Sequence, residues 1–148
     1  MKNGLAIAAA VTLLAMPAAA QEAVTYTTDA SFEDVTFALE NAIINQGLVI
    51  DSVSHIGTML ARTRADVGSD VKLFEGADAY SFCSADLSRQ VMEADIANIQ
   101  FCPYDIFVYV SAENPDETVV GFRGFPEGPM QEVQALLDTI AREAAGVE

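Results

Sequence analysis

The residues whose chemistry stands out are two cysteines, Cys83 and Cys102, with 18 residues between them. Two thiols can form a structural disulfide, supply a nucleophilic thiol, or bind a soft metal such as copper(I). The sequence holds no Ser-His-Asp arrangement, paired-carboxylate motif, phosphate-binding loop or haem-attachment motif. It therefore favours a non-catalytic protein, with no catalytic residue, metal site or cofactor assigned.

Three interpretations of the cysteines stay open. A disulfide suits an exported chain without a third cysteine. However, a helix of about 13 residues would separate the two residues by about 20 Å, and bridging needs Cα atoms within about 7 Å. A reactive thiol would be Cys83, because backbone amides at the start of a helix stabilise a thiolate, although a buried and inert cysteine at a strand end has the same sequence pattern. Copper is the least favoured, since only His55 or Met92 could complete the ligand set. We expect Cys83 and Cys102 to lie close together and favour the disulfide.

Several side chains are expected near this pair without requiring chemistry. Ser84, before the predicted helix, is interpreted as its cap. Arg89 and Glu93, one turn apart, are interpreted as a surface pair, and Met92 as core filler. The histidine is interpreted as a residue at a strand end. The candidate site comprises Cys83 and Cys102 with Ser84, Ser88, Arg89, Met92, Glu93, Tyr104 and His55.

The elements that must position these residues follow from periodicity and caps. Strands are predicted at residues 24–28, 48–54 and 78–83, and a hairpin at 104–110 and 118–123 around a turn at 111–117. Helices are predicted from the cap Ser31 to the stop Gly47, at 85–97, and from Pro129 to Gly146. This order predicts an α+β fold: a two-layer sandwich with a mostly antiparallel sheet of about five strands and helices on one face. The other face would be solvated or covered by a partner.

The segment between the second and third strands is predicted as a short helix at 59–67 and a loop at 69–77. Three of the six cations outside the N-terminal 20 residues, Arg62, Arg64 and Lys72, lie here. We interpret them as a solvated face that screens an acidic surface. The alternative is an opening that attracts an anionic ligand.

The N-terminus predicts export. Lys2 precedes an apolar run at residues 5–15, and small residues precede Gln21, which is typical of a signal peptide cleaved after Ala20. The mature chain, a single domain over 21–148, would carry six cations against 22 acids, a net charge of −16. This charge disfavours nucleic acid, and no later stretch is long and apolar enough to span a membrane. The expected location is periplasmic or secreted.

The central stretch, residues 82–109, contains Phe82-Cys83-Ser84-Ala85, Ser88-Arg89, Met92-Glu93-Ala94-Asp95, Asn98-Ile99, Phe101-Cys102-Pro103-Tyr104 and Val108-Tyr109. With these residues it resembles the bacterial and archaeal family called domain of unknown function 302 (DUF302). Residues at the start of the first helix and its stop at Gly47 also look like that family, and the resemblance covers roughly residues 25–145. It implies a compact two-layer α+β domain, often dimeric, with no assigned activity. Many relatives follow the first cysteine with Asn-Pro, where this chain has Ser84-Ala85.

Together these observations predict an exported, non-catalytic binding or accessory module of the cell envelope. Its expected partners are a second copy of the chain, forming a homodimer, and a small ligand or an envelope protein. The alternative function is a thiol-redox or thiol-reactive protein that uses Cys83 with Cys102, or, less favoured, a copper-binding protein.

Overall fold

The structure is a computed structural model that describes residues 22–147, so the expected signal peptide and its cleavage site lie outside the described residues. The described part contains five strands, four α-helices and one short 3₁₀ helix. In chain order these elements are β1 (Ala23–Thr28), α1 (Phe32–Asn45), β2 (Val49–Ser54), α2 (Ile56–Thr63), β3 (Phe74–Cys83), α3 (Ala85–Ala94), the 3₁₀ helix η1 (Ile96–Phe101), β4 (Tyr104–Ser111), β5 (Asn114–Arg123) and α4 (Met130–Ala145).

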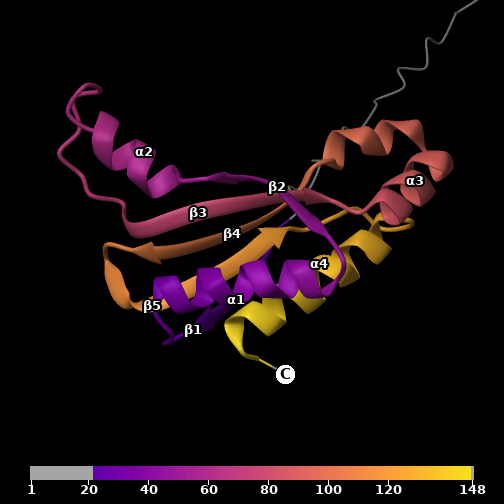
Figure 1. Ribbon diagram of the computed structural model, residues 1–148. Coiled ribbons are helices and arrows are strands. Elements are labelled where there is room, and N and C mark those ends of the chain that lie inside the picture. The colour runs from indigo at the N-terminus through magenta and orange to yellow at the C-terminus, as the bar shows by residue number, and fades with distance from the viewer. Residues whose placement is uncertain (1–21, 148) are drawn as a thin grey trace, which may run out of the picture.

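The five strands form one sheet in the order β1-β5-β4-β3-β2, and every neighbouring pair is antiparallel. The long strand β3 lies between β4 and the edge strand β2, while β1 closes the opposite edge against β5. Figure 1 shows α1 and α4 together along one side of the sheet, α2 on the other side of β3, and α3 at one end. The α+β fold predicted from the sequence is confirmed.

The core lies between the sheet and the pair α1 and α4. Alternate residues of the central strands point into it, as the period of two requires, and helical spacing brings the apolar stripes of α1 and α4 against them. The largest fully buried side chains are Tyr104, Phe82, Phe122, Leu39, Ile43, Ile106, Met130, Leu137, Ile140, Val35, Val91 and Val108.

Local signals explain the first helix. The Ser31 side chain caps α1 by accepting a hydrogen bond from the Asp34 amide at 3.1 Å. Glu33 and Asp34 place negative charge in the first turn, where the helix dipole stabilises it. The helix ends at Asn45, and Gly47 adopts a left-handed φ of 74° just beyond it. The predicted start and stop of this helix are therefore confirmed.

The helix α2 packs against the face of the sheet opposite α1 and α4. Gly76 and Ala77 are adjacent on β3 and point to opposite faces. A side chain at Gly76 would meet the Phe32 ring at the start of α1, whereas Ala77 lies beside Gly57 of α2. A β-carbon at Gly57 would come within 2.8 Å of the Ala77 nitrogen, so only glycine lets α2 approach β3 this closely. The predicted uncovered face thus carries α2 at one corner.

Element boundaries differ from the predicted ones where tertiary pairing overrides local composition. The helix α2 begins at Ile56, three residues before the predicted start, and β3 begins at Phe74 instead of residue 78 because it pairs with β4 as far as Ser111. The hairpin is tighter than predicted, since Asn114 pairs directly with Ser111. The helix α3 ends at Ala94, and extended Asp95 caps the separate helix η1.

Within residues 22–147, no helix is long and apolar enough to cross a membrane.

Candidate functional site

The two cysteines meet at the end of β3. Cys83 is the last residue of β3, and Cys102 directly follows η1, two residues before β4 begins at Tyr104. Their sulfur atoms are 2.6 Å apart. The helix α3 leads away from Cys83 and η1 leads back, which supplies the return that the sequence analysis required. The prediction that both cysteines share one environment is confirmed.

The predicted disulfide is not confirmed. The sulfur separation exceeds the bond length of about 2.05 Å, and both cysteines are free, each half-buried. The pair is therefore a dithiol in this structure.

The environment of Cys83 opposes a reactive thiolate. Burial raises the pKa of Cys83 to about 12, and the hydrogen bond and charge interaction with Cys102, together with Asp51, act in the same direction. A hydrogen bond from the Tyr104 backbone amide lowers the pKa, but it does not outweigh burial. At the start of α3 the Leu87 amide donates to the Ser84 side chain at 3.4 Å, so this amide is not available to stabilise a Cys83 thiolate.

This raised pKa predicts slow alkylation. We expect iodoacetamide to label Cys83 of the reduced protein slowly at neutral pH, with a rate that rises about tenfold per pH unit up to about pH 10, because only the thiolate reacts. Peptide mapping by mass spectrometry reports the labelled residue. The same protein in urea is the control, and its rate should level off near the ordinary thiol pKa of 9.0. A folded-state rate that saturates by pH 8 would contradict the prediction.

A hydroxyl pair flanks the cysteines on the core side. The Ser88 hydroxyl lies 3.0 Å from the Tyr104 hydroxyl and 3.9 Å from the Cys102 sulfur. Tyr104 is fully buried, and this burial raises its pKa. These two residues therefore line the buried side of the dithiol as neutral hydrogen-bonding groups.

The other predicted site residues do not join the dithiol. Arg89 and Glu93 form an exposed pair at 3.5 Å, and Met92 packs against the core. His55 pairs with Asp78 at 3.0 Å, five residues before Cys83 along β3, about 17 Å away in an extended strand. Among residues 22–147, no group of three or more His, Cys, Asp or Glu side chains is arranged to hold a metal ion.

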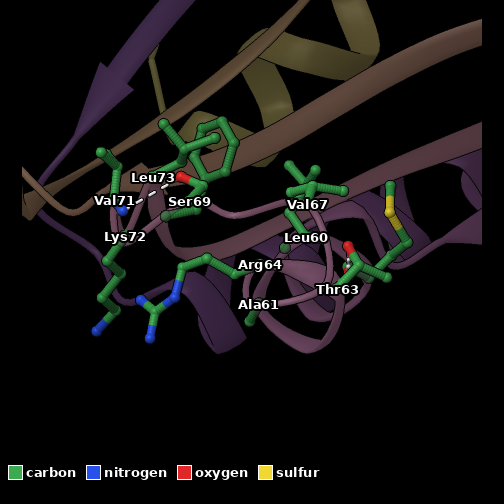
Figure 2. Close-up of a pocket in the computed structure, with 12 residues that line it drawn as sticks. Leu60, Ala61, Thr63, Arg64, Val67, Ser69, Val71, Lys72 and Leu73 are labelled. Atoms are coloured by element: carbon green, nitrogen blue, oxygen red, sulfur yellow. Dashed lines mark hydrogen bonds between the residues drawn. The ribbon is translucent and has the colours of Figure 1, made fainter.

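A pocket lies between α2, the loop after it and the beginning of β3 (Figure 2). The sequence favours a solvated face for this segment, with an opening as the alternative, and the structure contains an opening. Its volume is about 320 Å³, at the lower end of the range for small-molecule sites. The available signal was the apolar residues spaced through a segment interpreted as solvated. The lining residues are Gly57, Met59, Leu60, Ala61, Thr63, Arg64, Val67, Ser69, Val71, Lys72, Leu73 and Phe74.

The wall of this α2 pocket is apolar and its rim is cationic. Leu60 and Val67 lie near one another in Figure 2, while the Arg64 and Lys72 side chains extend toward a common side. Lys72 pairs with Glu75 at 2.6 Å. Arg64 makes no ion pair or side-chain hydrogen bond with any residue in the range 22–147. The pocket thus combines apolar surface with one unpaired and one paired cation.

Aromatic side chains continue from this pocket across the same face of the sheet. The Phe74 ring packs edge-on against the Tyr109 ring, with 5.7 Å between their centroids, and Tyr109 stacks on Phe107 with 6.1 Å between centroids. Phe107 lies over Gly121, where a β-carbon would come within 2.6 Å of its ring. The face of the sheet that was expected to be solvated or covered by a partner therefore carries α2 at one corner and aromatic rings at its centre.

Comparison with known proteins supports the fold. No protein-family model and no curated protein matches the sequence. The fold is similar to that of an uncharacterized conserved DUF302 protein from Bacillus stearothermophilus, with a TM-score of 0.58 and 16% sequence identity. The match covers 84% of this chain and 93% of that chain. The predicted resemblance to DUF302 is confirmed at the level of the fold, and it brings no assigned activity.

Proposed function

We propose that this chain is a small-ligand-binding module of the cell envelope and that its ligand occupies the α2 pocket. The observation that carries the proposal is the clustering of exposed apolar side chains. Nine large hydrophobic side chains are exposed among the described residues, and four of them line this one pocket. Contiguous exposed apolar surface marks interaction sites in folded proteins. Those four are Met59, Val67, Val71 and Leu73, which are between 42% and 75% exposed.

The helix α2 supports the proposal because the fold leaves it poorly packed. It has eight residues, none of them buried, and a helix this short gains little stability by itself. A ligand with apolar surface would cover the inner side of α2 and replace the missing contacts. The predicted export to the periplasm or the cell exterior rests on the N-terminal sequence and sets the environment in which we place the ligand.

The pocket predicts binding of a neutral apolar probe. We expect the neutral fluorophore Nile red to bind with a blue-shifted, enhanced emission, and Val67→Asp to weaken its apparent affinity about tenfold. Val67 is 75% exposed, so its replacement should leave the fold intact, yet it removes apolar contact and places a charge against the probe. Fluorescence titration measures both effects.

The matched control is Val49→Asp on β2. Val49 is 74% exposed, the charge change is the same, and the residue does not line the pocket. Equal probe affinity in the two variants would contradict the proposal. Light scattering on the same proteins tests the predicted homodimer: a dimer that Val67→Asp converts to a monomer would show that a second copy of the chain covers this surface, and would overturn the small-ligand assignment.

A second candidate function uses the dithiol. The contact between the Cys83 and Cys102 sulfur atoms favours a disulfide that closes after export, and the raised pKa of Cys83 disfavours a thiol nucleophile. This candidate concerns a stabilising crosslink at the end of the sheet rather than a catalytic thiol. Oxidation of the reduced protein, followed by measurement of its intact mass, tests this candidate.

A further inference from the structure

We infer that the ligand of the α2 pocket is a single-chain amphiphile that ends in a carboxylate, an inference that rests on the proposed binding function. The apolar part would lie against Leu60, Val67 and Leu73, and the carboxylate would meet Arg64 and Lys72 at the rim. The argument depends on the charge of the lining, the state of the two cations and the volume of the pocket.

The charge of the lining is opposite to that of the whole chain. The sequence has 22 acidic and seven basic residues, but the twelve lining residues include two cations and no acid. Two nearby acids, Asp66 and Asp70, belong to the same loop and do not line the pocket. A chain with a net negative charge repels anions in general, so the local cationic rim is the feature that would attract an anionic ligand to the pocket.

The two cations are suited to one carboxylate. Arg64 is exposed, and its guanidinium has no partner among residues 22–147, so its planar fork is free for a bidentate contact. Lys72 already donates to Glu75 at 2.6 Å, and an ammonium has three donors, so it can also donate to a second carboxylate. We therefore assign the principal anion contact to Arg64 and a supporting one to Lys72.

The volume of the pocket favours a slender ligand. About 320 Å³ is small for a cofactor or a two-chain lipid, whereas one medium-length hydrocarbon chain fits a pocket of this size. Apart from the two cations, the lining offers only two hydroxyl side chains, Thr63 and Ser69. Both hydroxyls already have a hydrogen-bond partner in the same segment. Thr63 donates to the Met59 carbonyl, and Ser69 accepts from the Val71 amide. Recognition therefore separates into an apolar chain and a single anionic end.

The test compares ligands with one tail and three head groups. In a fluorescence titration, each of three ligands competes with Nile red for the mature chain: decanoate, decanol and decylamine. Each ligand is kept below its micelle-forming concentration or, for decanol, its solubility limit. We expect decanoate to bind about fivefold more tightly than decanol, and decylamine more weakly than both. The factor is modest because rim ion pairs are exposed to water.

Two glutamine variants locate the effect. Arg64→Gln should weaken decanoate about fivefold and leave decanol unchanged, whereas Arg62→Gln, which removes the same charge two residues away from outside the lining, should change neither. The carboxylate assignment would be overturned if decanoate and decanol bound with equal affinity, or if the two variants lost equal affinity for decanoate. In either case, binding of Nile red would still support the proposed function. Failure of Nile red itself to bind would instead reject the proposed function.

Discussion

Replacing Phe82 by alanine is expected to lower the free energy of unfolding by about 3–5 kcal/mol. Phe82 is fully buried on β3, on the face of the sheet that α1 and α4 cover. Its removal would cost the transfer free energy of a large aromatic side chain and leave a cavity that the paired strands on both sides cannot close. Urea unfolding followed by circular dichroism measures the change.

The chain offers a matched control in Phe37→Ala. Phe37 lies on α1 and is 69% exposed, so the same substitution removes little buried surface and should change stability by no more than about 0.5 kcal/mol. The comparison tests which side of α1 faces the sheet. Similar losses in the two variants would mean that the layer arrangement is wrong.

Replacing Cys102 by serine is expected to lower the stability of the oxidised protein by about 2–5 kcal/mol. We expect oxidised dithiothreitol to close the pair: the two thiols lose two hydrogens, a sulfur–sulfur bond forms, and the cyclic disulfide of the reagent is reduced to a dithiol. The crosslink would close a loop with 18 residues between the cysteines. The lost conformational entropy would raise the free energy of the unfolded chain by about 3 kcal/mol. Intact mass reports the loss of two hydrogens, and urea unfolding reports the stability.

The control for the cysteine prediction is the reduced state. Under reducing conditions the wild type and Cys102→Ser should differ by much less, because the substitution then removes only a half-buried thiol. An unchanged mass after oxidation would reject the crosslink. Equal stabilities under oxidising conditions, with the mass change observed, would show that the crosslink forms but contributes nothing to stability.

The sequence by itself determined the local elements and the fold class. Ser31 and Gly47 mark the ends of α1 through a cap and a left-handed turn, and these signals act within a few residues. The alternating run from Tyr104 onward and its returning partner predict a hairpin for the same reason. Such features depend on short-range sterics and hydrogen bonding, so a single sequence is enough to read them. Their order along the chain then limits the architecture to a two-layer α+β fold.

Only the tertiary structure decided how distant segments meet. The route of η1 brings Cys102 back to Cys83, and the burial created there raises the pKa of Cys83 against the local influence of a following helix. The α2 pocket exists because Gly57 lets α2 rest on Ala77, so that the loop after α2 becomes one wall of an apolar hollow. The burial of these residues, and with it the pKa of Cys83 and the shape of the pocket, depends on which surfaces come into contact across the sheet. The spacing of apolar residues within one segment does not show which surface that segment will pack against.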